Sequence, residues 1–191
     1  MENAMPPVEI RLETERLILR PWRKSDAAAL YKYAKDEPVG DAAGWPPHKS
    51  IEESEEVIRT VFSAPEIYAI VPKTAKEPAG CVGLVFKRRA SMKDGDAEIG
   101  YWIGVPYWGR GLVPEAVACL LKRAFGTLGI DTVWCAYYEG NERSRRVAEK
   151  CGFRFHHVEE AAYGVAAECF TCLSREEWVR ESPASEWSRG K

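Results

Sequence analysis

The sequence predicts an α/β fold in which helices flank one mixed β-sheet. Three observations support this fold class. Strands and helices follow in the order β, α, α, β, β, β, α, β, α, β, β, the strongest helix directly follows a glycine-rich turn, and 46% of the 191 residues are apolar. This length suits one unit, so we expect a single domain over residues 1–191. Residues 1–7 should form a flexible lead-in and residues 174–191 a polar tail.

The first half of the chain predicts two helices between strands. A strand over residues 14–22 precedes a helix that Ser25 or Asp26 can cap and that should end at Pro38 and Gly40. Further elements are a helix that begins after Ser50 and runs to about Phe62, and strands over 67–71, 80–88 and 96–103.

The second half contains the strongest helix, over residues 113–125, where apolar residues recur with helical spacing and Pro114 falls in the first turn. The remaining predicted elements are a strand over 131–138, a helix over 142–150 that ends at Gly152, strands over 153–158 and 167–173, and a short helix after residue 174.

Composition and charge exclude several classes of function. Lys and Arg total 27 against 29 Asp and Glu, so the net charge of -2 gives no general attraction to nucleic acid or to an anionic membrane. No apolar run approaches the roughly 20 residues that a membrane span needs, and no signal peptide precedes the six cysteines. We therefore expect a cytoplasmic protein with reduced thiols. Cys169 and Cys172 lie three apart in a strand-like run and face opposite sides, so we expect no metal site.

A strand that passes through a glycine-rich turn into the strongest helix suits anion binding. Gly109 and Gly111 remove side chains there, so that main-chain N–H groups and the positive end of the helix dipole can approach a phosphate. A plain tight turn explains two such glycines as well. The turn has neither the Gly-Lys-Ser/Thr of a nucleotide P-loop nor the third glycine of a dinucleotide fingerprint.

The segment around this turn resembles the GNAT superfamily of N-acetyltransferases. The family's diphosphate pattern, Arg/Gln-x-x-Gly-x-Gly/Ala, matches Trp108–Val113, with Trp108 in place of Arg or Gln and Val113 in place of the last small residue. A second hallmark, Asn-x-x-Ser followed by Glu-Lys-x-Gly-Phe, matches Asn141–Phe153. The opening ETERLILRPW resembles the branch of ribosomal-protein-alanine N-acetyltransferases (RimJ/RimL-like), so the resemblance spans about residues 13–173.

The resemblance implies acetyl-coenzyme A (acetyl-CoA) as co-substrate and no metal. It implies a mostly antiparallel sheet of about seven strands, splayed at the fourth and fifth, with about four helices. Pantetheine would lie in the splay like an added strand, and the glycine turn would hold the diphosphate. The residues that the resemblance assigns to the coenzyme are Ile103, Gly104, Val105, Trp108, Gly109, Arg110, Gly111, Leu112, Val113, Asn141 and Arg146. Asn141 is equally well explained as a helix N-cap, and Arg146 with its neighbours as a solvated face.

The same resemblance suggests two catalytic residues. Glu98 matches the glutamate that several members use as base on the amine, although an ion pair with a Lys or Arg explains it nearly as well. Many members use a tyrosine to protonate the leaving thiolate, but this chain has Ala148 there. Ser144 is the expected substitute, with Tyr137 and Tyr138 as rivals. A histidine at 156 or 157 is an alternative base.

The acceptor is expected to be a primary amine, such as the N-terminus of a ribosomal protein. Trp45, His48, Trp102 and Tyr107 are candidate substrate contacts, with core packing as the alternative. The alternatives for the function are an enzyme that acetylates a small amine (an amino acid, an antibiotic or a polyamine) and a non-catalytic acyl-CoA sensor. The expected partners are acetyl-CoA and the amine acceptor, without nucleic acid or membrane, and family analogy allows a homodimer.

Overall fold

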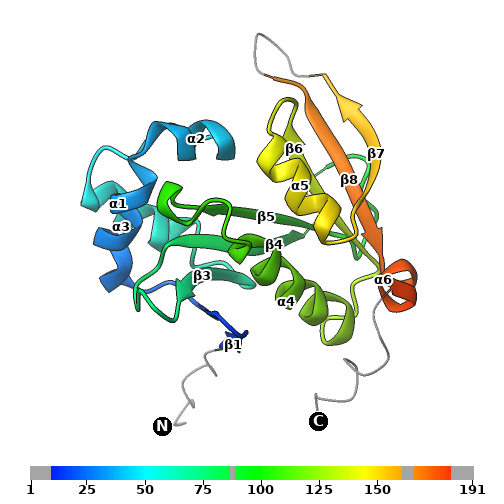
Figure 1. Ribbon diagram of the computed structural model, residues 1–191, viewed down its shortest axis with the longest axis horizontal. Helices are drawn as coiled ribbons and strands as arrows, with labels where there is room; N and C mark the ends of the chain where they lie inside the picture. The colour runs from blue at the N-terminus through cyan, green and yellow to red at the C-terminus, as the bar shows by residue number, and fades with distance from the viewer. Residues whose placement is uncertain (1–9, 87–88, 161–165, 182–191) are drawn as a thin grey trace, which may run out of the picture. The chain divides into compact units, whose positions relative to one another are not determined.

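The computed structural model describes residues 10–86, 89–160 and 166–181. Within them eight strands form one sheet in the order β1-β2-β3-β4-β5-β6-β8-β7 (Figure 1). The chain divides into two compact units. The first holds the described residues up to Val82 together with Trp102–Leu112, and the second holds Gly83–Tyr101 together with the residues from Val113 onward. Strands β4 (Gly80–Phe86) and β5 (Ala97–Ile103) each pass from one unit into the other. The single domain expected from the sequence stays a prediction.

The first unit combines antiparallel strands with three α-helices. Strand β2 (Leu17–Arg20) pairs with both β1 (Leu12–Glu13) and β3 (Ile67–Pro72). The helices of this unit are α1 (Ala27–Ala34), α2 (Glu37–Ala43) and α3 (Ile51–Thr60), with short 3-10 turns η1 (Lys24–Asp26) and η2 (Val105–Tyr107). Ser50 caps α3 as expected, because its hydroxyl accepts a hydrogen bond from the N–H of Glu53 at 3.1 Å.

Helix α2 was not anticipated, because Pro38 and Gly40 were expected to end the preceding helix. Pro38 instead lies in the first turn of α2, where its missing N–H costs nothing. Gly40 lies inside α2, and an added Cβ there would come within 2.5 Å of the Trp45 carbonyl oxygen. The helix ends one residue before Gly44, whose φ of 78° is left-handed. A glycine selected for close packing was therefore mistaken for a helix terminator.

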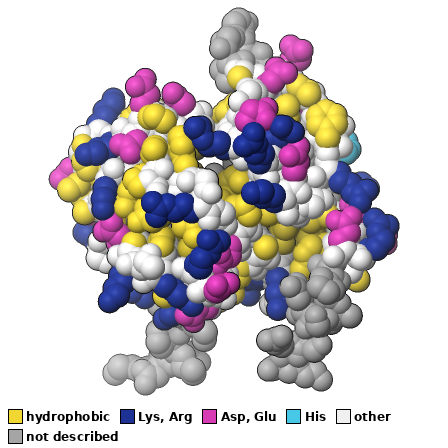
Figure 2. Space-filling view, viewed as in Figure 1, with side chains coloured by type: hydrophobic (Ala, Val, Ile, Leu, Met, Phe, Trp, Pro, Cys, Tyr) yellow, Lys and Arg dark blue, Asp and Glu magenta, His cyan; other side chains and the backbone are white. Residues whose placement is uncertain are grey.

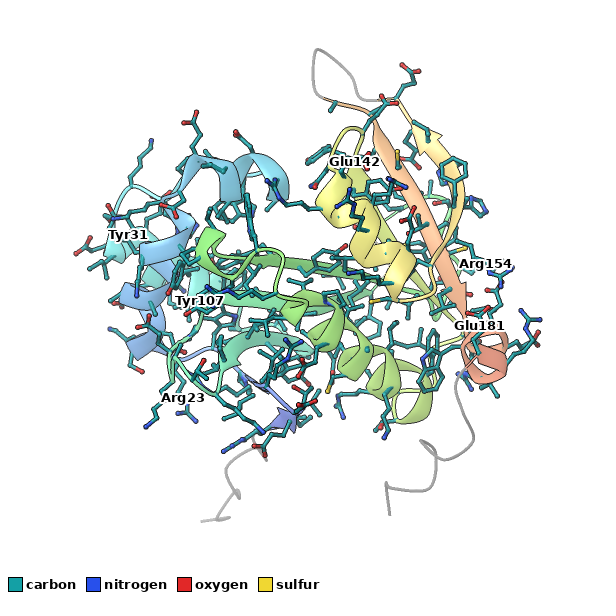
Figure 3. All side chains as sticks on the ribbon, in the orientation of Figure 1. Arg23, Tyr31, Tyr107, Glu142, Arg154 and Glu181 are labelled. Carbon is teal, nitrogen blue, oxygen red and sulfur yellow. The ribbon has the colours of Figure 1, made fainter. Side chains whose placement is uncertain are left out.

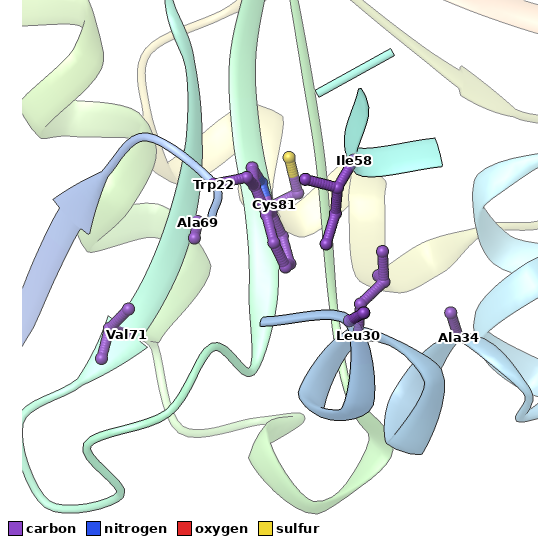
Figure 4. Close-up of a cluster of buried hydrophobic side chains, with 8 residues drawn as sticks. Trp22, Leu30, Ala34, Ile58, Ala69, Val71 and Cys81 are labelled. Atoms are coloured by element: carbon purple, nitrogen blue, oxygen red, sulfur yellow. The ribbon is translucent and has the colours of Figure 1, made fainter. Parts of the chain in front are cut away.

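A buried cluster and an ion pair fix the first unit. Trp22, Leu30 and Ile58 are among eight buried residues that pack together between the helices and the strands (Figure 4). Arg20 in β2 binds Asp26 in η1 through two parallel hydrogen bonds of 2.7 and 2.8 Å, and both side chains are largely buried. Burial of a charged pair requires this bidentate geometry to offset desolvation.

The second unit is built on β6 (Thr132–Tyr138), which pairs antiparallel with β8 (Glu168–Ser174) along its whole length. Strand β7 (Arg154–Glu159) pairs with β8 as the last strand in the order, with a register shift between Phe155 and His157. The helices of this unit are α4 (Leu112–Gly126, from its second residue), α5 (Glu142–Lys150) and α6 (Arg175–Glu181). Arg154 and Glu181 face each other across β7 and α6 at 2.7 Å (Figure 3).

The fourth and fifth predicted strands are β5 and β6, and they separate soon after they meet. Their parallel pairing covers two residue pairs, Ala97 with Val133 and Glu98 with Trp134. The predicted fold class is confirmed, with two revisions for the described residues. The sheet has eight strands rather than about seven, because the two-residue β1 was missed. There are six α-helices rather than about four: α2 was missed, and α6 is the short helix expected after residue 174. The predicted end of the third strand, at residues 87–88, lies outside the described residues.

The surface carries both signs of charge. Lys and Arg side chains are interspersed with Asp and Glu side chains on the face that Figure 2 shows, in keeping with the net charge of -2. Among the described helices, none has both the length and the apolar character needed to cross a bilayer.

Candidate functional site

In the first unit, the glycine turn has the backbone conformation that only glycine adopts readily. Gly109 and Gly111 have φ angles of +72° and +73°, in the left-handed region. They follow η2 and lead directly into α4, which begins at Leu112. A Cβ on Gly109 would meet nothing within 4 Å, so space lies open in front of this residue. The turn therefore combines exposed main chain with a helix N-terminus, as anion binding requires.

The end of β5 is tied to this turn by a side chain. The indole N–H of Trp108, which stands where the family pattern has Arg or Gln, donates to the carbonyl of Ile103 at 2.8 Å. The N–H of Gly104 donates to the carbonyl of Ala79 at 2.8 Å and is already used within the unit. Val105 is 38% exposed. Of these expected pantetheine contacts, the amide of Gly104 is therefore the least suitable.

The flanking residues of the turn differ in their exposure. The side chains of Leu112 and Val113 are buried, so any contact they make with a ligand runs through the main chain. Arg110 is exposed, and its guanidinium lies 5.5 Å from the centre of the Tyr107 ring. Tyr107 in turn packs edge-on against Tyr33 at 5.9 Å. The structure thus gives Tyr107 a packing partner in the helix α1 and sets it apart from the other three expected substrate contacts.

Arg16 contacts the glycine turn, a role that the sequence did not reveal. Its guanidinium donates to the carbonyls of Arg110 at 2.8 Å and Gly111 at 3.2 Å. Arg16 precedes β2 and is separated from the turn by more than 90 residues of sequence. No local spacing signals such a contact, although the arginine belongs to the ETERLILRPW segment.

In the second unit, the pairing of β5 with β6 covers Ala97 and Glu98 and goes no further, while the other side of β5 pairs with β4. Gly100 lies in the middle of the strand, is exposed, and has nothing within 4 Å of an added Cβ. A glycine in a strand often marks the close approach of another backbone or a ligand. An extended chain such as pantetheine can add to the side of a strand that has no paired neighbour.

Glu98 is buried and takes part in an ion-pair network. The Nε of Arg89 lies 3.4 Å from a carboxylate oxygen of Glu98, and the same guanidinium contacts Glu168 at 2.8 Å. The Arg89 side chain also lies over the ring of Phe170. The ion pair considered as an alternative explanation for Glu98 is therefore present, and the role of Glu98 as base stays a prediction.

Ser144 makes a close contact with a tyrosine from β5. The hydroxyl oxygens of Tyr101 and Ser144 are 2.8 Å apart, and the Tyr101 hydroxyl lies 3.7 Å from Sγ of Cys135. Burial raises the pKa of Tyr101 well above its ordinary value. The side chain of Asn141 accepts a hydrogen bond from the N–H of Ser144 at 3.1 Å, so Asn141 caps α5. Sequence reasoning considered Tyr137 and Tyr138 but missed Tyr101.

The arginines of α5 differ in their surroundings. Arg145 binds Glu142 at 2.6 Å and Glu149 on the same helix, which fits the solvated-face interpretation. Arg146 is exposed on this helix, so its side chain can reach solvent or a bound anion. Its assignment to the coenzyme stays a prediction.

Three of the four expected substrate contacts gather in the first unit. The ring of Trp45 lies 5.4 Å from that of His48 and 5.8 Å from that of Trp102. Trp45 and Trp102 are partly buried against the hydrophobic cluster of Figure 4, so much of their surface serves core packing. His48 is held through Nδ1, which lies 2.8 Å from the hydroxyl of Ser54. Because that hydroxyl donates to the carbonyl of Ser50, it accepts from His48, which leaves Nε2 unprotonated when the ring is neutral.

His48 favours the neutral form. Burial lowers the pKa of His48, which the nearby Glu53 opposes in part. The ring therefore presents Nε2 as a hydrogen-bond acceptor at neutral pH.

The two adjacent histidines of β7 contact each other. Nδ1 of His156 lies 2.7 Å from Nδ1 of His157, whose Nε2 lies 3.2 Å from Glu159. The His157 ring stacks on Phe170 at 4.8 Å. These contacts explain both histidines as parts of a packed surface, and the role of either as base stays a prediction.

The cysteines are free thiols in unreactive surroundings. Burial raises the pKa of Cys151 to about 12 and also raises the pKa of Cys119. A thiol with a raised pKa is a poor nucleophile at neutral pH. In the part of the chain that the structure describes, no three His, Cys, Asp or Glu side chains are grouped so that they could hold a metal ion.

Comparison with known proteins gives consistent results. A family model described as the acetyltransferase (GNAT) domain matches residues 16–154. The uncharacterized N-acetyltransferase YoaA of Bacillus subtilis is 29% identical over 148 residues, which cover 75% of this chain and 82% of YoaA.

Solved structures share the fold. An acetyltransferase (GNAT family) from Bacillus anthracis matches with a TM-score of 0.77 at 20% identity, over 88% of this chain and 100% of the other. The ribosomal-protein-S5-alanine acetyltransferase from Vibrio fischeri matches with a TM-score of 0.72 at 19% identity, over 92% of this chain and 100% of the other.

Proposed function

Because this chain belongs to the GNAT acetyltransferase family and is an acyltransferase, we propose that it moves the acetyl group of acetyl-CoA to a primary amine. The amine attacks directly while both substrates are bound. The observation that carries the proposal is the glycine turn at 109–111, whose left-handed main chain leads into α4. Such a turn suits a diphosphate, the chemical group that distinguishes coenzyme A from simple thioesters.

The chain's own groups fit the coenzyme. Space is open in front of Gly109 and Gly100, and the pairing of β5 with β6 ends at Glu98, whereas its other side pairs with β4. The main-chain N–H groups from Gly109 to Leu112 would hold the diphosphate, and those near Ile103 would contact the pantetheine arm and the thioester oxygen. When bound, the coenzyme supplies a thioester carbonyl that an amine can attack.

Glu98 and Ser144 are the proposed proton carriers. An amine attacks only when neutral, whereas a free α-amine has a pKa of about 7.7 to 8.0 and a lysine about 10.4. Glu98 takes the proton that the nitrogen loses as the C–N bond forms. Ser144 gives a proton to the sulfur as the C–S bond breaks, and Tyr101 can replace it because the two hydroxyls are hydrogen-bonded.

For the acceptor we propose the N-terminal amine of a protein. The support is the resemblance of the ETERLILRPW segment to enzymes of that kind and the shared fold with the ribosomal-protein-S5-alanine acetyltransferase of Vibrio fischeri. A small amine is the second candidate. The aromatic group of Trp45, His48 and Trp102 favours it, because aromatic faces attract cations.

A panel of acceptors tests this function. The purified protein would be given acetyl-CoA and one of three acceptors: a peptide with a free N-terminal alanine, the same peptide with a blocked N-terminus and an internal lysine, or spermidine. We expect turnover with the free N-terminus, detected as release of the coenzyme thiol together with the acetylated peptide. Turnover with spermidine alone would support the small-amine alternative. Tight binding of coenzyme A without turnover on any amine would support the sensor and reject the proposed reaction.

A further inference from the structure

We infer that Arg16 is a positioning residue that sets the direction of the main chain in the glycine turn, so that two N–H groups face the diphosphate of the coenzyme. This inference rests on the proposed function and adds a residue from outside the turn. Arg16 contacts the turn through carbonyls and has no assigned contact with substrate, so its effect on the reaction is indirect.

Arg16 contacts the turn through both terminal nitrogens of its guanidinium. One guanidinium nitrogen donates to the carbonyl of Arg110 at 2.8 Å, and the other donates to the carbonyl of Gly111 at 3.2 Å. The planar guanidinium holds both carbonyls at once, which a lysine ammonium cannot do with fixed geometry.

Arg16 is itself held in place at its main chain. Its carbonyl accepts a hydrogen bond from the N–H of Lys73 at 2.9 Å, next to the pairing of Leu17 with Pro72. The hydroxyl of Thr14 accepts from the N–H of Leu17 at 3.0 Å and closes the turn between β1 and β2. The main chain of Arg16 is therefore anchored at the edge of β2 in the first unit, which also contains the glycine turn.

The geometry of the peptide bond determines where the N–H groups of the turn point. In a trans peptide the C=O and the following N–H point in opposite directions, and the described residues contain no cis peptide bond. The carbonyls of Arg110 and Gly111 point toward Arg16. The N–H groups of Gly111 and Leu112 therefore point away from Arg16, as a pair, into the side where an anion can bind.

This constraint matters because glycine is flexible. A residue without Cβ populates both positive and negative φ, so the peptide planes around Gly111 would otherwise sample several directions. A Cβ on Gly111 would lie 3.6 Å from the guanidinium of Arg16, which shows how closely the arginine packs on this residue. Arg16 thus reduces the conformational cost of binding, which is the usual benefit of preorganisation.

The test compares two acetyl donors, one with the diphosphate of coenzyme A and one without it. Arg16→Ala and the control Arg11→Ala would be assayed with acetyl-CoA and with S-acetyl-N-acetylcysteamine, a thioester that lacks diphosphate, and coenzyme A binding would be measured by calorimetry. Arg11 is an exposed arginine that pairs with Glu13 at the start of the same hairpin. For Arg16→Ala we expect about a tenfold rise in the Kd of coenzyme A and in the KM for acetyl-CoA. Its kinetics with the short thioester should match the wild type, as should all values for Arg11→Ala.

Each contrary result has a distinct meaning. Equal coenzyme A affinity in wild type and Arg16→Ala overturns the positioning role and leaves the proposed function standing. A parallel loss with both donors also overturns it, because general damage to the fold affects both. Failure of the wild type itself to bind coenzyme A overturns the proposed function. If Arg16→Ala does not fold, Arg16→Lys serves instead, with a smaller rise expected for acetyl-CoA only, and an unchanged KM overturns the inference.

Discussion

The hydroxyls of Tyr101 and Ser144 lie 2.8 Å apart and join β5 to the first turn of α5. Burial raises the pKa of Tyr101 well above its ordinary value, so the phenol stays protonated throughout the range in which an acetyltransferase is assayed. Two neutral hydroxyls in contact can pass a proton from one to the other. We propose this pair as the proton donor, because Ala148 stands at the family's usual tyrosine position.

Removing either hydroxyl should slow the reaction without weakening coenzyme binding. For Ser144→Ala we expect kcat to fall about a hundredfold, because general acid catalysis typically contributes at least that much. For Tyr101→Phe we expect a smaller fall, of about tenfold. Tyr31→Phe is the matched control, since its hydroxyl lies in the first unit and contacts the carbonyl of Lys49. Steady-state kinetics with acetyl-CoA measure kcat and the KM for acetyl-CoA. Full kcat in both variants would remove the pair from the mechanism.

Gly111→Ala should weaken coenzyme A binding, whereas a glycine substitution with the same backbone strain elsewhere should not. A side chain at φ +73° costs roughly 1–2 kcal/mol in any left-handed position. Gly129, with φ +71°, provides a control with the same strain outside the turn. Urea unfolding should show similar losses for Gly111→Ala and Gly129→Ala, whereas calorimetry should show weaker binding only for Gly111→Ala. Equal affinity in both variants would contradict the assignment of the turn to the diphosphate.

Glu98→Gln separates a catalytic base from a structural ion pair. Arg89 contacts both Glu98 and Glu168, so Glu168→Gln removes the other carboxylate of the same network. If Glu98 takes the proton of the amine, kcat/KM should fall about a hundredfold in Glu98→Gln and remain near the wild-type value in Glu168→Gln. Profiles of kcat/KM against pH are the measurement. Similar losses in the two variants would assign Glu98 to the network alone.

Asp26→Ala should destabilise the protein strongly. The change leaves the buried guanidinium of Arg20 without its bidentate partner and removes the acceptor of the Arg23 N–H. Breaking a buried pair from one side costs about 3 kcal/mol or more. Glu55→Ala breaks the exposed pair with Lys24 and should cost less than about 1 kcal/mol. Denaturant unfolding of both variants gives the comparison, and a loss below about 1 kcal/mol for Asp26→Ala would contradict it.

Stability should fall in alkaline solution. Burial raises the pKa of Cys81, Cys135 and Cys151 to about 12 in the folded protein, while unfolded thiols titrate near about 8.5. The folded state therefore keeps protons that the unfolded state loses, so the free energy of unfolding is complete below about pH 8.5 and decreases as pH rises toward 12. Urea unfolding at pH 7.5 and pH 10 measures the decrease. Cys135→Ala should show a smaller pH dependence than the wild type.

The sequence predicted the elements whose signals are local. The helix α4, the Ser50 cap of α3 and the glycine-rich turn that leads into α4 all have signals in neighbouring residues, and all are present in the structure. Helix α2 was missed because Pro38 and Gly40 can either end a helix or lie within one. Only the close approach of the Trp45 carbonyl to Gly40 explains why a glycine lies inside this helix.

The candidate site was predictable only in part, for a related reason. The turn and the N-cap Asn141 follow from motifs, but Arg16 and Tyr101 reach their partners across 94 and 43 residues of sequence. The network of Arg89 with Glu98 and Glu168 likewise joins residues that no spacing rule connects. Contacts of this kind depend on the packing of strands and helices, which a single sequence does not specify.

Strand β7 is an edge strand of the sheet and carries two exposed apolar side chains, Phe155 and Val158. An exposed edge strand can pair with a strand of another molecule, which is one route to aggregation. The register shift after Phe155 interrupts the regular row of hydrogen-bonding groups, and charged Arg154 and Glu159 stand at the two ends of the strand. The irregular, charged edge of β7 thus opposes regular pairing with a strand of another molecule.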